Sequence, residues 1–419
     1  MIRMTRTALV TGALLGGIAS AHAQELPTIE AGSLQAISPA PAVQDLQAAA
    51  RASGMVQPDV VGPPLKVFPY SVTTPRGGGT WTGTIVGADP RANGARTTNI
   101  PVVLIPLRVQ FTGVTPQRNF DPTSPDVGCL GAGNTALQRT LDSPIFTPIP
   151  NLTINGVNMG NVTFIDAFQR AQFWSTASGG PMVSGKPAYH LGLPITMASV
   201  QTISVPVGTN AALYNLTGNC NTNTTAQDNP PNFGVININT IDPLLNAIIT
   251  SLGINQSQFP LFLIYGVVMS NGAANNINNC CIIGYHNGSG NSAAPGQTYG
   301  IAEYDAGVAF GTAIRDVTTL AHEVLEWVND PSGNNIVPAW GGLGQVSGCQ
   351  NNLETGDPAD EPSGSNHAIV APNGFTYHPQ ENAFFNWFLP GTFLGAGGKF
   401  SSKGSFGGFA KACPPGGTN

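Results

Sequence analysis

The sequence has few charged side chains and no basic patch. Only 9% of its residues are Asp, Glu, Lys or Arg, and the 16 basic residues include just 5 lysines. Domains that bind nucleic acid carry a basic stripe or patch, so a chain with a net charge of -6 and no such patch is not expected to bind nucleic acid. Beyond the N-terminal segment no apolar run is long enough to span a bilayer, so no membrane partner is expected for the mature chain.

Cysteine is also scarce, and its spacing excludes a zinc site built from thiolates. The chain has six cysteines but no Cys-x-x-Cys pair. An even number in an exported chain predicts three disulfides, although 15 pairings are possible. We expect the adjacent Cys280 and Cys281 to bond to different partners. The other cysteines are Cys129, Cys220, Cys349 and Cys413.

Glutamate is missing from a long part of the chain. Between Glu30 and Glu303 there are 272 residues without one, and six then occur within 79 residues. This distribution indicates that the later glutamates serve a local purpose. They are Glu303, Glu323, Glu326, Glu354, Glu361 and Glu381.

The first 23 residues resemble a secretory signal peptide. A basic start is followed by the apolar run Ala8–Ala19 and by Ala21-His22-Ala23, a small-x-small cleavage site. We expect a mature chain that begins near Gln24, is exported to the periplasm or outside a bacterial cell, and is a monomer. Residues 24–65 are rich in Ala, Pro, Gln and Ser. They are expected to form a flexible leader, with a pro-segment as the alternative.

Residues 66–419 are expected to form one α+β domain that is rich in β-strands. We divide it into a β-rich N-terminal part to about residue 240, a motif core at 241–330 and a C-terminal subdomain at 331–419. Alternating or β-branched runs predict strands at 80–86, 100–111, 261–269, 281–286 and 298–304. Helices are predicted at 135–141, 164–174, 241–253 and 380–388, and a terminal hairpin at 400–409.

Punctuation residues support one of these helices. In the helix at 241–253, Asp242 is the expected N-cap and Gly253 the expected stop. A further helix is predicted from about Gly311 to Asp330. Its expected buried stripe is Ile314, Val317, Ala321, Val324 and Val328.

This last helix carries the pattern His322-Glu323-Val324-Leu325-Glu326. Residues four apart lie on the same helix face, so His322 and Glu326 are placed side by side where one cation could bind both. Glu323 is next to them, close enough to act on a water bound there. From the composition of the chain, chance produces such a pattern about twice in a thousand sequences of this kind, so coincidence is a poor explanation.

The stretch resembles the active-site helix of zincin metallopeptidases, which use a second His at the position of Glu326. The close match covers about a dozen residues, including the uncharged residues that flank the motif. The resemblance implies a mixed sheet packed on the active-site helix, Zn²⁺ as cofactor, Glu323 as general base and a protein or peptide as substrate. It also implies Glu354 as third metal ligand and Asp357 as the group that accepts the other ring N–H of His322.

The glutamate at position 326 changes the expected chemistry. Two carboxylates and one imidazole neutralise Zn²⁺ more fully than one carboxylate and two imidazoles, and they acidify its water less. An oxygen-rich ligand set also makes Ca²⁺, Mn²⁺ or Fe²⁺ plausible. His378 is the rival third ligand, and Tyr377 or His378 is the expected oxyanion-stabilising group.

Three classes of function compete. The first is the secreted peptidase. The second is a secreted binding or structural protein that keeps the metal and has lost turnover. The third is a glycoside hydrolase that uses Glu323 and Glu354. In the simplest alternative to any of these, His322 and Glu326 form an ordinary exposed helix pair. The remaining histidines, His190, His286 and His367, are expected to be surface or core residues.

Overall fold

The computed structural model describes a large part of the chain. The signal peptide, Cys220 and Glu361 lie outside the described residues, as does most of the leader. The described residues are 26–30, 32–34, 62–74, 76, 78–92, 96–178, 183, 189–217, 233–359, 366–391, 393–411 and 413.

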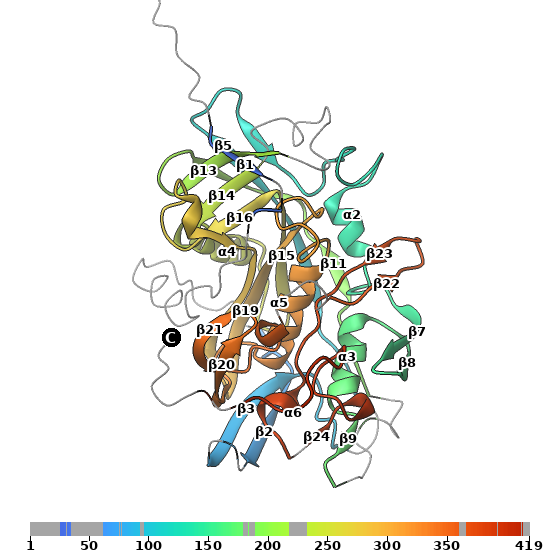
Figure 1. Ribbon diagram of the computed structural model, residues 1–419. Helices are drawn as coiled ribbons and strands as arrows, with labels where there is room; N and C mark the ends of the chain where they lie inside the picture. Colours follow the sequence, from blue (N-terminus) through green and yellow to red (C-terminus); the bar gives the residue numbers. More distant parts are fainter. Residues whose placement is uncertain are drawn as a thin grey trace, which may run out of the picture.

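A seven-stranded mixed sheet forms the centre of the molecule (Figure 1). Its strands are β5 (Val102–Thr112), β6 (Arg118–Phe120), β11 (Ile195–Met197), β12 (Gln201–Pro206), β15 (Phe259–Tyr265), β18 (Gly284–Asn291) and β19 (Ala294–Tyr304). The order is β11-β5-β15-β19-β18, and β12 and β6 also pair with β5. The middle strands are parallel, whereas β18 runs antiparallel to β19 at one edge.

Helices cover both faces of this sheet. The helix α4 (Ile238–Ser251) packs on one face, while α3 (Phe164–Gln172) and α5 (Thr318–Asn329) pack on the other. Successive side chains of a strand point to opposite faces, so Leu104 belongs to the core beside α5 and its neighbour Ile105 to the core beside α4.

A second sheet lies beside the first and has the order β1-β13-β14-β16-β17. Its strands are β1 (Thr28–Glu30), β13 (Ala211–Thr217), β14 (Phe233–Asn237), β16 (Val267–Ser270) and β17 (Cys280–Ile282). The strand β1 pairs in parallel with β13, so these three residues of the expected leader form part of the sheet.

Smaller elements complete the described fold. The strand pairs are β2 (Val67–Thr74) with β3 (Gly79–Val86), β4 (Arg96–Asn99) with β10 (Tyr189–Gly192), β7 (Ile149–Ile154) with β8 (Val157–Val162), β9 (Ser175–Thr176) with β24 (Phe393–Leu394), β20 (Ile336–Leu343) with β21 (Val346–Asn352), and β22 (Ile369–Val370) with β23 (Thr376–Tyr377). Two short helices are α2 (Ala136–Leu141) and α6 (Phe385–Phe388).

The structure confirms a β-rich α+β chain but corrects several boundaries. The helix α5 begins at Thr318, not near Gly311, because Gly311 and Asp316 have positive φ angles of 66° and 42°. The expected strand at 261–269 is two strands, β15 and β16, which separate at Gly266, where φ is 69°. Residues 400–409 form no hairpin, and their only strand-like contact is a bridge from Ser401 to Ala383.

The helix α4 begins earlier than the sequence indicates. Its N-cap is Asn237, whose side chain accepts the backbone N–H of Asn239 at 2.8 Å. The expected cap, Asp242, is buried inside the helix and instead accepts hydrogen bonds from the hydroxyls of Tyr285 and Tyr299. The predicted stop is borne out, since the helix ends just before Gly253.

The disulfides also differ from one expectation. Cys280 and Cys281 are bonded to each other and not to separate partners. Cys349 is bonded to Cys413, which ties the C-terminal segment to β21. Cys129 is disulfide-bonded as well.

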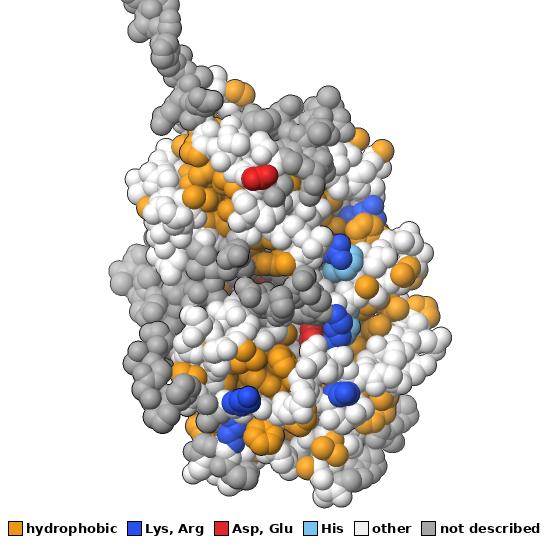
Figure 2. All heavy atoms as spheres, in the orientation of Figure 1, with side chains coloured by type: hydrophobic (Ala, Val, Ile, Leu, Met, Phe, Trp, Pro, Cys, Tyr) orange, Lys and Arg blue, Asp and Glu red, His pale blue; other side chains and the backbone are white. Residues whose placement is uncertain are grey.

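Charged side chains are few and scattered on the face shown in Figure 2. Within the described part of the chain, no helix is both long enough and apolar enough to cross a membrane.

Candidate metal centre

The motif helix α5 is an internal helix. All 12 of its residues are buried, including His322, Glu323 and Glu326. All five residues of the predicted stripe are buried, but only Ala321, Val324 and Val328 belong to the helix, because Ile314 and Val317 precede it. The prediction of one buried face was nevertheless incomplete, because the polar face of α5 is covered by β18 and by the segment at 354–357.

His322 is held between acidic groups on one side and an amide on the other. Its Nε2 lies 3.0 Å from Oε2 of Glu326 and 3.5 Å from Oδ1 of Asp357. Its Nδ1 lies 2.9 Å from Oε1 of Gln380, whose amide nitrogen donates to the carbonyl of Gly356 at 2.9 Å. The amide is thereby oriented so that His322 donates from Nδ1 and presents Nε2 to the two carboxylates.

The segment at 354–357 lies flat against the imidazole of His322. A Cβ at Gly356 would be 2.5 Å from Nδ1 of His322, so only glycine permits this approach. The close packing lets the backbone N–H groups of Gly356 and Asp357 donate to Oε1 of Glu326, at 2.9 and 3.2 Å. One oxygen of Glu326 is therefore fixed by the backbone, and the other faces the histidines.

Asp357 occupies a different place from the one the sequence indicated. It was expected to accept the ring N–H of His322 that does not face the metal; Gln380 lies at Nδ1, and Asp357 faces Nε2 together with Glu326. Its carboxylate accepts hydrogen bonds from Gln350, at 2.6 Å, and from Gln345. The β20–β21 hairpin, which carries these two amides, thus fixes the carboxylate of Asp357.

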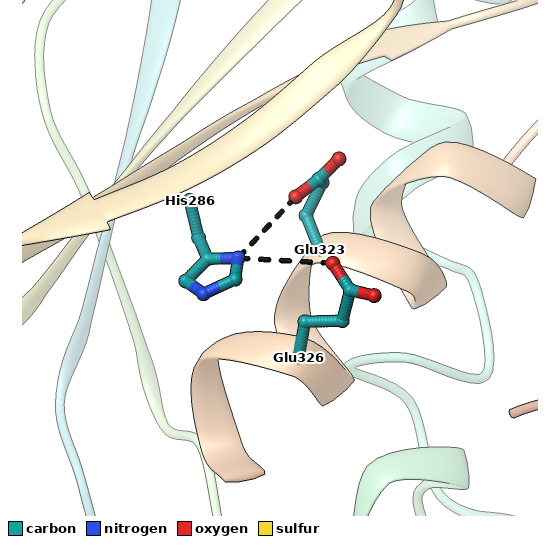
Figure 3. Close-up of side chains that lie close together, drawn as sticks. All are labelled: His286, Glu323 and Glu326. Atoms are coloured by element: carbon teal, nitrogen blue, oxygen red, sulfur yellow. Dashed lines mark ion pairs between the residues drawn. The ribbon is translucent and has the colours of Figure 1, made fainter. Parts of the chain in front are cut away.

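His286 is the residue that the sequence analysis missed. It projects from β18, and its Nδ1 points toward Glu323 and Glu326 of α5, as Figure 3 shows. Nδ1 lies 3.6 Å from Oε2 of Glu323 and 3.8 Å from Oε2 of Glu326. Its other nitrogen, Nε2, lies 3.0 Å from the carbonyl oxygen of Asp330.

A glycine allows the strand to come this close to the helix. Gly284 is two residues before His286, so both lie on the face of β18 that meets α5. A Cβ at Gly284 would lie 2.8 Å from Cγ of Glu323 and 2.6 Å from a methyl group of Thr319. The spacing Gly284-x-His286 is the signal that could have placed His286 opposite the motif helix.

Glu354, the expected third ligand, reaches the same cluster from another side. Its Oε2 is 3.9 Å from Nε2 of His286, and it accepts no hydrogen bond from any described residue. Burial, followed by repulsion from Glu326 and Asp330, raises the pKa of the Glu354 carboxyl well above its usual value. It belongs to neither of the two side-chain groups whose ligand atoms lie within 4.8 Å of one another.

Negative charge dominates the cluster. Five buried carboxyl groups (Glu323, Glu326, Asp330, Glu354 and Asp357) surround two buried imidazoles. Burial alone lowers the pKa of both imidazoles, but Glu326 and Asp357 raise the pKa of His322 well above its usual value, and Glu323 and Glu326 raise that of His286. Even with both imidazoles protonated, five ionised carboxylates leave an excess of three negative charges, which a buried site cannot hold without protons or cations.

Two predicted catalytic residues lie elsewhere. The hydroxyl of Tyr377 accepts a hydrogen bond from the side-chain amide of Asn373 at 3.1 Å, and its ring belongs to the core. Nδ1 of His378 lies 2.6 Å from Oδ2 of Asp316, and its side chain lines a cavity of about 190 Å³ with Arg139 and Arg315. His378 is connected to α5 through its carbonyl, which accepts from Thr318 at 2.8 Å, one turn before His322.

The other histidines and glutamates have separate environments. His190 pairs with Asp166 at 2.7 Å, and His367 lies 2.9 Å from the hydroxyl of Ser402. Glu381 accepts hydrogen bonds from the terminal segment at 401–405. Of the clustered glutamates in the sequence, the structure brings three together: Glu323, Glu326 and Glu354.

Two groups of side chains in the described residues could hold a metal ion. One is His322, Glu326 and Asp357, and the other is His286, Glu323 and Glu326; within each group the ligand atoms lie within 4.8 Å of one another. Comparison with protein-family models, curated proteins and solved structures identifies no match. Because these comparisons suggest no function, the proposals below are based on the chemistry of this cluster.

Proposed function

We propose that the protein is a metal-dependent hydrolase that cleaves peptide bonds, with a divalent cation held by His322, Glu326 and Asp357. The observation that carries the proposal is the orientation of His322. Because Nδ1 donates to Gln380, a neutral imidazole presents the lone pair of Nε2 to two carboxylates. Three electron-rich atoms that face one another need a cation or a proton between them, and an orienting partner on the other ring nitrogen is typical of a ligating histidine.

The donor atoms indicate the kind of cation. One imidazole nitrogen with carboxylate oxygens suits Zn²⁺, Mn²⁺ or Fe²⁺, whereas Ca²⁺ prefers a shell made of oxygen alone. The buried excess of carboxylates supports a divalent ion over a proton on His322. The ligand assignment differs from the one that the motif implied, with Asp357 in the place of Glu354.

A divalent cation in this position would polarise a substrate carbonyl and lower the pKa of a bound water. Glu323 would accept the proton of that water and deliver it to the leaving amine, because its carboxylate lies within 4.8 Å of the ligand oxygen of Glu326. The resemblance of α5 to the zincin helix supports peptide hydrolysis. Export of the chain would give it protein or peptide substrates outside the cell.

A second candidate is a metal-stabilised protein without turnover. It is favoured by burial, since His322, Glu326 and Asp357 are only 7%, 4% and 4% exposed. A structural metal site is closed by the protein, whereas a catalytic one keeps a position for water. In this case the cation would fix α5, β18 and the segment at 354–357 together.

The two candidates are separated by a casein-cleavage assay with and without a chelator. Activity that is lost with chelator and restored by Zn²⁺ or Mn²⁺ supports the hydrolase, provided that Glu323→Gln binds the cation and lowers kcat by at least about 100-fold. Bound cation without cleavage supports the structural candidate. A matched control is Glu303→Gln, which replaces a buried glutamate outside the cluster. Burial and the charge of Asp305 raise the pKa of Glu303. Cleavage unaffected by chelation or by Glu323→Gln contradicts the hydrolase proposal.

A further inference from the structure

The side chain of His286 is oriented as a metal ligand by a group that can only accept a hydrogen bond. Its Nε2 lies 3.0 Å from the backbone carbonyl of Asp330, so Nε2 carries the proton. In the neutral ring, Nδ1 then presents its lone pair to Glu323 and Glu326 (Figure 3). This repeats, on the strand β18, the arrangement that His322 has on the helix α5 between Gln380 and two carboxylates.

We propose that the cluster binds a second divalent cation through His286, Glu323 and Glu326, adjacent to the first and sharing Glu326 with it. The inference depends on the proposed function in one respect, namely that a first cation is bound by His322, Glu326 and Asp357. It assigns the protein a two-metal centre in which one carboxylate bridges the ions.

The spacing of the ligand atoms fits a shared cation better than a direct ion pair. The separations of 3.6 and 3.8 Å between Nδ1 of His286 and the two carboxylate oxygens exceed those of a good N–H···O bond. Ligand atoms that each lie about 2.1 Å from one tetrahedral ion are about 3.4 Å apart. The gap between His286 and the carboxylates is therefore close to the width that an ion requires.

Glu326 is suited to bridge the two positions. Its Oε1 is held by the backbone N–H groups of Gly356 and Asp357. Its Oε2 is 3.0 Å from Nε2 of His322 and 3.8 Å from Nδ1 of His286, so this one oxygen faces both imidazoles. Cations in two-metal hydrolases lie about 3.5–4 Å apart, a distance that a shared carboxylate oxygen can span.

Glu354 is a further buried carboxyl group of the cluster and lies on the Nε2 side of His286. Its side chain is only 10% exposed, and its Oε2 has no hydrogen-bond partner among the described residues. Such an oxygen, 3.9 Å from Nε2 of His286, is costly unless an ion or a proton satisfies it. A second cation would also reduce the negative excess that one divalent ion leaves in the cluster.

The second position is compatible with a proton-accepting role for Glu323. Its Oε2 faces His286 and would bind the cation, whereas its Oε1 lies toward Gly284. A carboxylate bound through one oxygen retains lone pairs on the other. Because a nitrogen ligand is present, the second cation is also expected to be Zn²⁺, Mn²⁺ or Fe²⁺ and not Ca²⁺ or Mg²⁺.

Manganese titration of the full-length mature protein, stripped with a chelator, tests the inference. Wild-type protein is expected to bind two Mn²⁺ per chain by equilibrium dialysis and mass spectrometry, and to show the electron paramagnetic resonance signal of an exchange-coupled pair. His286→Ala should bind one ion and lose the coupled signal. The control His190→Ala removes another histidine that faces a carboxylate, Asp166, and should bind two ions.

The possible failures can be told apart. One uncoupled Mn²⁺ in the wild type, kept in His286→Ala and lost in His322→Ala, overturns the second position and leaves the proposed function intact. Two ions retained in His286→Ala also overturn it. No bound ion in the wild type overturns both proposals. If His286→Ala does not fold, His286→Asn and the coupled signal of the wild type decide the matter.

Discussion

Oε1 of Gln380 lies 2.9 Å from Nδ1 of His322, and the same side chain donates from its amide nitrogen to the carbonyl of Gly356. This amide therefore fixes both the tautomer of the imidazole and the position of the backbone that packs on it. Gln380 is 58 residues away from His322 in the sequence, and no local pattern pairs them. In the proposed metal site, Gln380 is therefore the partner that would orient His322 toward a cation.

Removing this partner should weaken metal binding without removing a ligand. Replacement of an orienting partner typically reduces metal affinity 10–100-fold, so Gln380→Ala is expected to lower cation affinity by about this factor. Gln380→Glu should retain most of the affinity, because a carboxylate also accepts the Nδ1–H. Competition with a chelating dye measures both values. Equal affinity in Gln380→Ala and wild type would show that Gln380 has no orienting role.

A methyl group at Gly284 should separate β18 from α5. Its Cβ would lie 2.8 Å from Cγ of Glu323, so Gly284→Ala is expected to cost about 1–3 kcal/mol of unfolding free energy. The control is Gly208→Ala, where a Cβ meets no atom within 4 Å. Urea unfolding compares the two variants. An equal effect at both positions would contradict the close approach of strand and helix.

The buried carboxyl group of Asp305 should make the free energy of unfolding depend on pH, independently of the candidate metal centre. Burial raises the pKa of its carboxyl to about 7, and its Oδ2 accepts no hydrogen bond from the described residues. Because the pKa of an unfolded Asp is about 3.9, the folded chain binds the extra proton between these values. The stability that this group contributes is therefore greatest at low pH and falls as the pH rises toward 7.

The variant Asp305→Asn should remove this dependence, since its amide oxygen can still accept the backbone N–H of Val308. Relative to wild type, the variant should gain stability as the pH rises from 5 to 7, by up to about 1.4 kcal/mol per pH unit. Urea unfolding at several pH values gives the difference. A stability difference that does not change with pH would mean that Asp305 is ionised throughout.

The disulfide between Cys349 and Cys413 should stabilise the C-terminal part. The two cysteines are 64 residues apart in the sequence. A cross-link that closes a loop of this length lowers the entropy of the unfolded chain, which raises the free energy of unfolding by about 4 kcal/mol. Replacing both by serine is expected to lower the unfolding free energy by about this amount. Calorimetry measures the change, and a loss below about 1 kcal/mol would contradict this entropic account.

The local features of the fold could be predicted from the sequence. Helices were predicted at 135–141 and 164–174, where α2 and α3 lie, and apolar periodicity predicted a core face for α5. The start of α5 was predicted too early, because the positive φ at Asp316 depends on its bridge to Asp305. Apolar periodicity does not report such tertiary contacts.

The candidate site could be predicted only in part, for a similar reason. Helical spacing pairs His322 with Glu326, and the resemblance to the zincin helix implied that Glu354 approaches them. The choice between Glu354 and Asp357 depends on the β20–β21 hairpin, and the approach of His286 depends on sheet register. Both are set by contacts between residues far apart in the chain, which local patterns do not encode.

The most direct test of the central claim is the metal content of purified mature protein, measured by mass spectrometry for wild type and Glu326→Ala after incubation with Zn²⁺. Glu326 belongs to both candidate metal groups. The account predicts near-stoichiometric or higher cation content in the wild type and its loss in Glu326→Ala, with Glu303→Gln unchanged. A wild type that binds no cation, or a Glu326→Ala protein that keeps it, would contradict the claim that this buried cluster is a metal centre.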